Sequence, residues 1–308
     1  MSEEVFIPKE EENVYQKGED EKILTNMKLK VASDDSKPRS LTRSEILDFG
    51  SEGFLLHGIL SQQECQEYIQ EFENEGFGAI PELVKNNYRS CERLLVQSSA
   101  LASHLWDTIK THVEDIEIHG DPHQQHIHGL KQALQGRWKP YGLNELFRIC
   151  KYQPGGHFAP HFDGHFVSSS EKRSMKTFMI YLNDDFTGGT TNFVDESQQL
   201  HMDSSGKYCA EEKNVIHRVQ PETGMAIIFN HHRLHEGERI KSGVKYIMRT
   251  DIMYHRVEKM AASEQDEMAI QLLQEAERLE AQGKCAEAAE LYRKAFKLSP
   301  NIEDSFKP

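Results

Sequence analysis

Residues 151–163 read KYQPGGHFAPHFD, and this stretch decides how the rest of the chain is interpreted. Tyr152 ends a run of β-forming residues, and Pro154-Gly155-Gly156 has the composition of a turn. The motif His161-Phe162-Asp163 follows the turn. In a strand, side chains two residues apart point to the same side, so His161 and Asp163 can reach a single metal ion.

The H-x-D pattern alone is a weak signal, because it also occurs at His119-Gly120-Asp121 and His201-Met202-Asp203. The first of these two lies in a polar, histidine-rich stretch before the strand-rich region. The other lies only 34 residues before His235, which leaves room for few strands. His161 and His235 are 74 residues apart, with several predicted strands between them. Two histidines and one carboxylate are the ligand set of non-haem Fe(II) oxygenases.

The second histidine ligand is ambiguous from the sequence. His235 is the best candidate, but His217, His231 and His232 are also available. A 2-oxoacid cosubstrate of such a centre has a distal carboxylate, which requires a buried cation. Lys245, on the predicted next strand, supplies one.

Arg249 is the competing anion ligand, because it shares a strand face with Lys245 and Asp251. Arg249 could equally form a salt bridge with Asp251.

The region 145–257 contains short β-like runs separated by turn residues, which predicts an antiparallel sandwich or barrel. The predicted strands are Leu146–Tyr152, Thr177–Leu182, Thr191–Val194, Ile216–Val219, Ala226–Phe229 and Val244–Tyr254.

Before this region, the sequence predicts a strand at Phe54–Leu60 and a helix that begins at the capping residue Ser61 and ends near Gly76. A second helix is expected over Ser98–Val113, and a loop over the histidine-rich run 119–128. Residues 1–45 are polar and acidic, and we expect them to be disordered. The main domain is therefore expected to span 46–257.

The last residues, 258–308, predict a helical hairpin with helices at Ser263–Gln282 and Cys285–Leu298. Small and aromatic residues in it, such as Ala288 and Tyr292, have the spacing of the second half of a tetratricopeptide repeat. Such repeats normally need about three copies to share a core, so a single one would dock on the main domain or on a partner.

The composition narrows the classes of partner. The net charge of −14 disfavours an electrostatic grip on nucleic acid or on anionic lipid, and no stretch has the length and hydropathy of a membrane span. The five cysteines are scattered without a C-x-x-C pair, and the N-terminal residues lack the features of a signal peptide. We therefore expect a reducing compartment, the cytoplasm or the nucleus.

Several segments, in order, resemble the Fe(II)/2-oxoglutarate dioxygenases of the prolyl 4-hydroxylase type. They are Lys151–Asp163, Ile180-Tyr181-Leu182-Asn183-Asp184, Gly188-Gly189-Thr190-Thr191-Asn192-Phe193, Val219–Phe229 and Lys241–Tyr254. The resemblance is best over 145–257. It extends more weakly to about residue 50, where Leu60-Ser61-x-x-Glu64-Cys65 resembles the opening helix of the family.

The resemblance implies a double-stranded β-helix, which is a jelly-roll sandwich, with flanking helices. It implies that His161, Asp163 and His235 bind Fe(II), and that Lys245 binds the distal carboxylate of 2-oxoglutarate. Tyr152 matches a tyrosine that often hydrogen-bonds this carboxylate, and Thr191 matches a position that lines the pocket. It further implies O2 as oxidant, ascorbate as reductant, and succinate and CO2 as coproducts.

We therefore expect an enzyme that hydroxylates a C–H bond, foremost that of a prolyl residue in a protein. One alternative is a non-catalytic adapter that has kept the fold and binds partners through its acidic tail and its hairpin. Another is a dioxygenase acting on a small molecule or a nucleobase.

Overall fold

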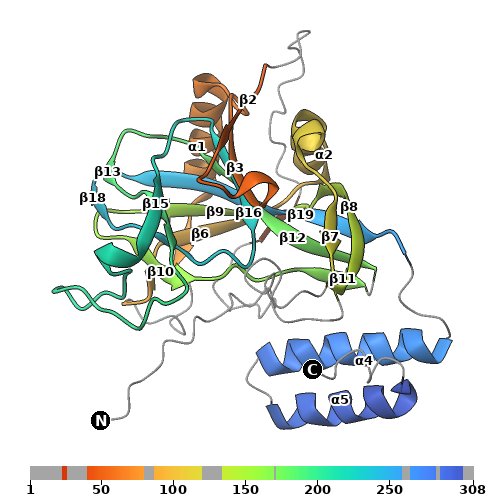
Figure 1. Cartoon of the computed structure of the whole chain (residues 1–308). Helices are drawn as coiled ribbons and strands as arrows, with labels where there is room; N and C mark the ends of the chain where they lie inside the picture. Colours follow the sequence, from red (N-terminus) through yellow and green to blue (C-terminus); the bar gives the residue numbers. More distant parts are fainter. Residues whose placement is uncertain are drawn as a thin grey trace.

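The computed structural model describes residues 23–25, 40–79, 87–119, 134–169, 171–258, 264–281 and 285–300. Two β-sheets lie face to face, and helices cover the outer side of the larger sheet (Figure 1). A hairpin of two helices follows the last strand. No helix in these ranges is long and apolar enough to cross a membrane.

The larger sheet places its strands in an order that differs from their order in the chain. From one edge to the other it runs β1 (Ile23–Thr25), β6 (Glu92–Gln97), β9 (Leu146–Tyr152), β19 (Lys245–Arg256), β12 (Lys172–Tyr181), β16 (Ala226–Asn230), β3 (Gly53–His57) and β2 (Thr42–Glu45). Four further strands extend it: β4 (Gly78–Ala79), β7 (Ile116–Ile118), β8 (Gly136–Leu143) and β11 (Val167–Ser169).

The smaller sheet carries two of the three predicted iron ligands. Its order is β15 (Val215–Val219), β14 (Thr191–Val194), β17 (His235–Gly237), β10 (His157–His161) and β5 (Arg89–Ser90). A separate strand pair is formed by β13 (Thr187–Gly188) and β18 (Ile240–Ser242).

From β9 onward the chain passes repeatedly between the two sheets. β9, β12, β16 and β19 belong to the larger sheet, whereas β10, β14, β15 and β17 belong to the smaller one. This alternation of antiparallel strands is a double-stranded β-helix, so the predicted fold is confirmed.

The alternation of side chains in the larger sheet separates two hydrophobic cores. Phe178 and Ile180 of β12 point outward to the helices, and Met179 and Tyr181 point inward to the smaller sheet. Both faces of β12 are therefore covered, which explains why the strand is buried along almost its whole length. The inner face forms the wall of the space in which the functional site lies.

The predicted helices form, and their ends follow from local chemistry. α1 (Gln62–Glu75) begins with a complete capping box between Ser61 and Glu64. It ends at Gly76, whose φ of 82° lies in the left-handed region that favours glycine. α2 (Ser99–Ile109) is capped by the side chain of Ser98, and a short 3-10 helix continues to His112. Both helices pack on the outer core of the larger sheet.

The N-terminal segment 1–45 was expected to be disordered, and this needs correction for two stretches. β1 pairs in parallel with β6, and β2 pairs with β3 at the opposite edge of the larger sheet. Backbone pairing with existing strands orders these residues, although the sequence of β2 is polar and β1 has only three residues. The rest of 1–39 and the histidine-rich run 120–128 lie outside the described residues.

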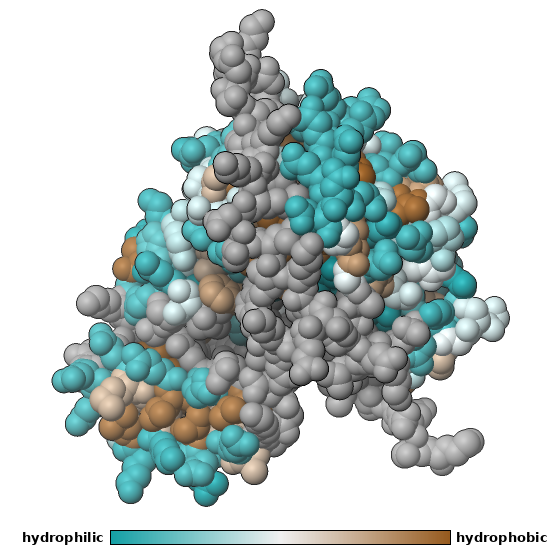
Figure 2. Space-filling view, turned by 180° about the vertical axis from the view of Figure 1, so that it is seen from behind, coloured by the Kyte–Doolittle hydropathy of each residue, from teal (hydrophilic) through white to brown (hydrophobic). Residues whose placement is uncertain are grey.

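The C-terminal hairpin consists of α4 (Glu264–Ala281) and α5 (Cys285–Leu298), close to the predicted boundaries. Ala269, Leu273 and Ala295 form its small core, where the alanines allow the helices to approach closely. Figure 2 shows a row of hydrophobic side chains along the hairpin, bordered by hydrophilic ones. The likeness to a tetratricopeptide repeat stays a prediction.

Candidate metal centre and central pocket

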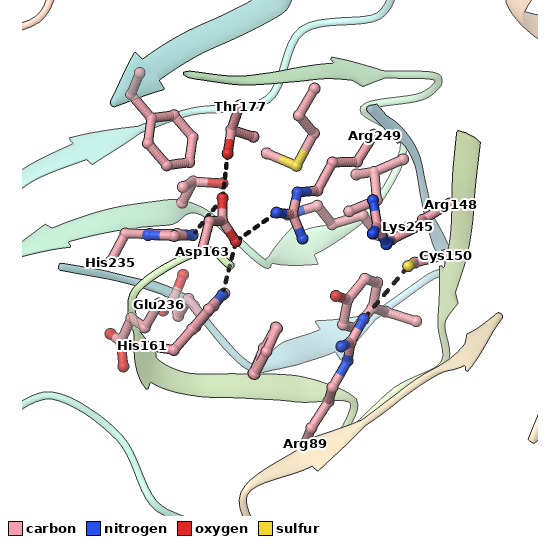
Figure 3. Close-up of a pocket in the computed structure, with 18 of the residues that line it drawn as sticks. Arg89, Arg148, Cys150, His161, Asp163, Thr177, His235, Glu236, Lys245 and Arg249 are labelled. Atoms are coloured by element: carbon pink, nitrogen blue, oxygen red, sulfur yellow. Dashed lines mark hydrogen bonds and ion pairs between the residues drawn. The ribbon is translucent and has the colours of Figure 1, made fainter. Parts of the chain in front are cut away.

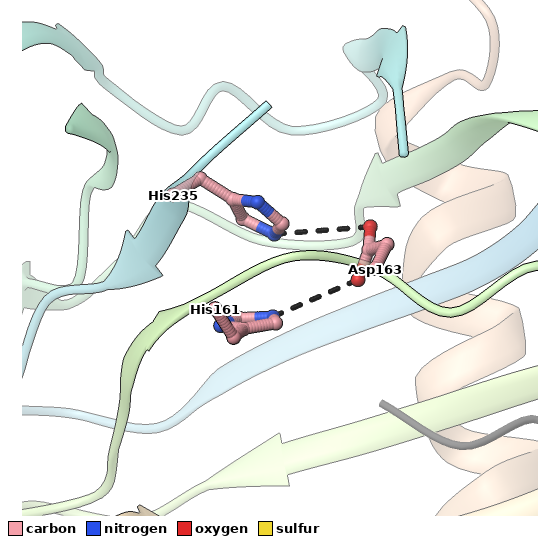
Figure 4. Close-up of side chains that lie close together, drawn as sticks. All are labelled: His161, Asp163 and His235. Carbon is pink, nitrogen blue, oxygen red and sulfur yellow. Dashed lines mark ion pairs between the residues drawn. The ribbon is translucent and has the colours of Figure 1, made fainter. Parts of the chain in front are cut away.

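Three side chains that are far apart in the sequence meet between the two sheets. His161 ends β10, Asp163 follows two residues later, and His235 begins β17. In the paired strands His161 lies opposite His235. One ligand atom from each of the three residues falls within 4.8 Å of the others, and all three residues are buried (Figure 4).

The two imidazoles present the nitrogen that a metal ion requires. Nδ1 of His161 lies 2.8 Å from the carbonyl oxygen of Ala159, and Nδ1 of His235 lies 2.8 Å from that of Arg233. Because a carbonyl only accepts, each Nδ1 carries the proton and each Nε2 keeps its lone pair. These Nε2 atoms lie 3.6 and 3.7 Å from the carboxylate oxygens of Asp163.

The protonation states of the same residues also suit a cation. Burial lowers the pKa of His235 to about 4, and repulsion by His161 acts in the same direction. Burial alone would raise the pKa of Asp163, but the charge of Arg249 holds it well below its ordinary value. At neutral pH the site therefore consists of a neutral His235 beside an ionised Asp163, which fits a divalent metal ion.

Asp163 is held in place by two further contacts, shown in Figure 3. Arg249 Nη2 lies 2.9 Å from its Oδ1, and the hydroxyl of Thr177 donates to its Oδ2. Thr177 in turn lies 3.1 Å from Nδ1 of His231, whose Nε2 lies 2.9 Å from the hydroxyl of Ser174. Partners that orient a ligating carboxylate are a regular feature of metal sites.

A pocket, here called the central pocket, extends from His161, Asp163 and His235 to Lys245 at the first residue of β19. Its floor is formed by β9, β19 and β12, in which Tyr152 lies opposite Lys245, and Arg148 opposite Arg249. Lys245 and Arg249 share one face of β19, as the sequence predicted (Figure 3). The floor therefore carries a cation at each end.

The two cations have different environments. Lys245 Nζ donates to the carbonyl oxygen of Gly189 at 2.6 Å and lies 5.2 Å from the centre of the Tyr181 ring. Arg249 interacts with Asp163 and, at 3.8 Å, with Asp251. Arg249 thus serves the carboxylate beside the metal centre, whereas Lys245 is the cation of this strand face that lies at the far end of the pocket.

Burial lowers the pKa of Lys245 to about 7, an effect that the negative charge of Glu238 and the nearby Cys150 partly oppose. The buried ammonium group of Lys245 has lost its hydration, and the nearby negative charges replace only part of it. An anionic ligand is therefore favoured, because it stabilises the charged form.

Tyr152 and Thr191 both line the central pocket, as expected. The hydroxyl of Tyr181 donates to Thr191 Oγ1 at 2.7 Å, and the ring of Tyr152 lies 5.9 Å from Lys245 Nζ. The structure therefore places these two residues at the Lys245 end of the pocket, away from the metal ligands.

Of the alternative ligands, His231 is buried but points to Thr177 and Ser174, so it supports the site from outside. His217 lies opposite Phe193 on β15, at the other edge of the smaller sheet. Asp203 belongs to an exposed turn, where it bonds to Ser205 and Lys207.

Sequence reasoning missed Thr177 and Arg89 as pocket residues. Thr177 could have been found, because it shares the inner face of a correctly predicted strand with Met179 and Tyr181. Arg89 lies on β5, a strand of two residues that pairs with β10 and that no local pattern indicates.

Comparison with known proteins agrees with this geometry. Residues 147–254, about a third of the chain, match the family model of the 2OG-Fe(II) oxygenase superfamily. This segment is a 2OG-Fe(II) oxygenase domain. The match contains His161, Asp163, His235 and Lys245, and the family implies Fe(II) and 2-oxoglutarate as cofactor and cosubstrate.

Two curated relatives resemble nearly half of the chain. Prolyl 4-hydroxylase subunit alpha-3 of Mus musculus is 31% identical over 146 residues, which cover 46% of this chain and 24% of that protein. The Homo sapiens protein of the same name is 29% identical over 160 residues, covering 49% and 26%. The chain thus matches about a quarter of the length of these relatives. The oxygenase domain is prolyl 4-hydroxylase-like.

Solved structures of prolyl hydroxylases also align with the chain. The viral collagen prolyl hydroxylase from Paramecium bursaria Chlorella virus-1, in complex with 2-oxoglutarate, is 19% identical, with a TM-score of 0.39. The alignment covers 68% of this chain and 99% of that one. A Trichoplax adhaerens prolyl hydroxylase, bound to a peptide of the hypoxia inducible factor oxygen degradation domain, is 12% identical, covers 67% and 84%, and has a TM-score of 0.42.

The contact between Thr177 and Asp163 leads to a testable prediction. Replacing Thr177 with valine keeps the shape of the side chain but removes the hydroxyl that fixes the carboxylate. We expect the affinity for Fe(II), or for Co(II) as a spectroscopic probe, to fall about 10–100-fold, as for other outer partners of metal ligands.

A matched control for this variant is Thr250→Val. The Thr250 hydroxyl is also buried, but it donates only to the carbonyl oxygens of Asn144 and Leu146. This control should lower the melting temperature and leave the metal affinity unchanged. Equal metal affinity in Thr177→Val and in the unmodified protein would show that the hydroxyl does not orient the ligand.

Proposed function

We propose that the chain is an Fe(II)- and 2-oxoglutarate-dependent hydroxylase that acts on a residue of a protein, foremost a prolyl residue. The observation that carries the proposal is the meeting of three ligand atoms within 4.8 Å at one end of a pocket whose other end holds a buried lysine. This arrangement fits a metal ion together with a cosubstrate that is anionic at its far end.

The protein residues have distinct tasks in this proposal. His161, Asp163 and His235 would hold the iron through Nε2, a carboxylate oxygen and Nε2, respectively. The protons on both Nδ1 atoms are taken up by backbone carbonyls, so the rings keep the orientation that binding requires. Arg249 keeps Asp163 ionised and in place.

Lys245 would bind the distal carboxylate of 2-oxoglutarate, with Tyr152 and the Tyr181–Thr191 pair beside it. Apolar side chains of Met179, Phe229 and Ile247 line the space between the two ends and exclude water. When bound, the iron and 2-oxoglutarate together supply the oxidation of a C–H bond by O2, with succinate and CO2 as coproducts.

The prolyl preference is supported by the similarity to prolyl 4-hydroxylase subunits, of which this chain covers only part. A protein or peptide substrate fits the same comparison, since one aligned hydroxylase is bound to a peptide. Ascorbate as reductant and partner docking through the C-terminal hairpin belong to this proposal as well.

The first test is turnover of 2-oxoglutarate to succinate with Fe(II) and ascorbate, with a panel of proline-containing peptides and metabolites. We expect turnover by the full chain and none by His161→Ala. If the chain neither binds iron nor consumes 2-oxoglutarate with any member of the panel, a non-catalytic adapter that has kept the fold is the better description.

The second test identifies the substrate. An Asp163→Ala chain is used to trap bound proteins, and the active chain is then added with Fe(II) and 2-oxoglutarate. A mass gain of one oxygen on a trapped protein, mapped to proline, supports the proposal. A gain on a metabolite or nucleobase, with trapped proteins unchanged, would instead assign a small-molecule or nucleic-acid dioxygenase.

A further inference from the structure

Two cysteines lie side by side at the central pocket, and one of them, Cys150, lines it. Cys150, on β9, is buried and lines the pocket, and the thiols of Cys91 and Cys150 share a hydrogen bond. Arg89 contacts both sulfur atoms. Its Nε donates to Cys91 Sγ at 3.3 Å, and its Nη2 donates to Cys150 Sγ at 3.6 Å, the second of which is drawn in Figure 3. The two thiols and the guanidinium thus form one cluster.

Cys91 occupies a special position in the fold. It lies between β5, which pairs with β10 of the smaller sheet, and β6, which pairs with β9 of the larger sheet. Cys91 is therefore the residue at which the chain passes from one sheet to the other. Cys91 is half-buried, whereas Cys150 is buried, so Cys91 is the more exposed residue of the two.

We propose that Cys91 and Cys150 form an oxidisable dithiol, which hydrogen peroxide converts to a disulfide and which a small thiol reduces again. The chemistry of the cluster supports the order of events. Burial alone would raise the pKa of Cys91, but the hydrogen bond from Cys150 and the charge of Arg89 lower it to about 6. The same hydrogen bond raises the pKa of Cys150 well above its ordinary value.

The oxidation takes two balanced steps. The Cys91 thiolate attacks one oxygen of hydrogen peroxide, giving a sulfenic acid and releasing hydroxide. The Cys150 sulfur then attacks the sulfenic sulfur, and its proton leaves with the hydroxyl group as water. Overall, two thiols and one peroxide yield one disulfide and two waters. A reducing thiol reverses the change through a mixed disulfide.

The position of the bridge predicts its effect on the pocket. Arg93 lies directly opposite Cys150, so Cys91, two residues earlier, is the diagonal neighbour of Cys150 on the same face. Diagonal positions are about 7–8 Å apart between Cα atoms, beyond the usual span of a disulfide, so the strands must shift to form the bond.

The strand that shifts, β9, carries Tyr152 two residues after Cys150, and Tyr152 lies opposite Lys245. Formation of the disulfide also removes the Cys91 thiolate, which accepts a hydrogen bond from Arg89. We therefore expect the oxidised chain to bind 2-oxoglutarate about tenfold more weakly, which corresponds to 1.4 kcal/mol. Only this consequence rests on the proposed function.

The chain offers a matched control in Cys209, which is also half-buried. Burial, together with the charges of Glu236 and Asp203, raises the pKa of Cys209 to about 11, so its thiol stays protonated. Cys209→Ser should therefore oxidise like the unmodified chain.

The experiment treats the full chain, freed of iron by a chelator, with hydrogen peroxide near pH 7 and maps the cysteines by mass spectrometry. We expect one peptide pair joined through Cys91 and Cys150 with the loss of two hydrogens, and its release by dithiothreitol. In Cys150→Ser, Cys91 should stop at the sulfenic acid, which dimedone traps. In Cys91→Ser no bridge should form.

A bridge between other cysteines, or oxidation of Cys209 as fast as that of Cys91, overturns the proposal. The second readout is 2-oxoglutarate binding in the presence of Mn(II), before and after oxidation. Unchanged affinity of a fully bridged chain overturns the effect on the pocket. If the reduced chain binds no 2-oxoglutarate, the proposed function fails. The cysteine mapping still shows in that case whether Cys91 and Cys150 form a disulfide.

Discussion

Replacing Asp163 with alanine is expected to abolish both metal binding and turnover. The variant removes the anionic ligand of the centre and the group that Arg249 and Thr177 contact. Loss of a ligating carboxylate forfeits several kcal/mol of metal binding, so we expect the affinity for Fe(II) to fall by more than about 1,000-fold. Isothermal titration with Fe(II) under anaerobic conditions, or with Co(II), measures this directly.

Two further variants separate loss of the ligand from loss of packing. Asp163→Asn has almost the same volume and still accepts the hydrogen bond from Thr177, but it carries no charge. Its melting temperature should fall because Arg249 loses a charged partner, but the side chain leaves no cavity, and the folded variant should fail to turn over 2-oxoglutarate. If Asp163→Asn turns over 2-oxoglutarate at the rate of the unmodified protein, Asp163 is not a required metal ligand.

Asp203→Asn is the control from the competing H-x-D motif. Asp203 lies in an exposed turn, where its Oδ1 accepts from the backbone of Ser205 and Lys207. We expect this variant to keep its metal affinity and its turnover. The sequence alone could not decide between the two motifs by pattern, whereas their burial in the structure predicts opposite outcomes.

The parts of the fold that were predictable share a physical reason. β9 and β14 were predicted with their observed ends because both are rich in apolar, aromatic and β-branched residues and are bounded by turn residues. α1 was predicted from Ser61, Glu64 and Gly76, which act through local hydrogen bonds and backbone geometry. In each case the signal lies within the element itself.

The parts that were missed depend on partners distant in the sequence. β17 contains only His235, Glu236 and Gly237, and it is a strand because β10 and β14 pair with it on both sides. β8 contains Pro140 and polar residues, and its pairing with the last part of β19 orders it. No local pattern contains this information.

The same distinction applies to the site. His161 and Asp163 were predictable because one motif contains both, and Lys245 because it lies on a predicted strand. His235 was one of four candidate histidines, and the resemblance to the family singled it out. The support for Asp163 was not predictable, since Thr177 and His231 are 54 positions apart and meet only through β12 and β16. The role of Arg249, left open by the sequence, follows from its contact with Asp163.

Replacing Lys245 with methionine is expected to have the second large effect, on cosubstrate affinity. Methionine keeps most of the length of the side chain and removes its charge from the far end of the central pocket. Loss of one partner from a buried charge pair costs about 2–5 kcal/mol, so we expect the Kd for 2-oxoglutarate to rise at least 30-fold. Titration with 2-oxoglutarate in the presence of Mn(II) measures this, and the metal affinity itself should not change.

The pH dependence gives an independent signature of the same residue. Since burial lowers the pKa of Lys245 to about 7 in the free protein, its ammonium group is increasingly lost above pH 7. A dianion binds the charged form, so affinity should be constant below pH 7. Above pH 7 the affinity should fall by up to tenfold per pH unit. The fall should end at the pKa of Lys245 in the complex, which the bound anion raises. Lys245→Arg, which stays charged, should bind with little dependence on pH in this range.

Arg249 provides an informative comparison, because it is a second cation on the same face of β19 as Lys245. Its guanidinium contacts Asp163, so Arg249→Met should weaken metal binding first and cosubstrate binding as a consequence. Lys245→Met should weaken cosubstrate binding alone. If instead Lys245→Met binds 2-oxoglutarate normally and Arg249→Met loses it at saturating metal, the carboxylate lies at Arg249, and the cosubstrate has the opposite orientation in the pocket.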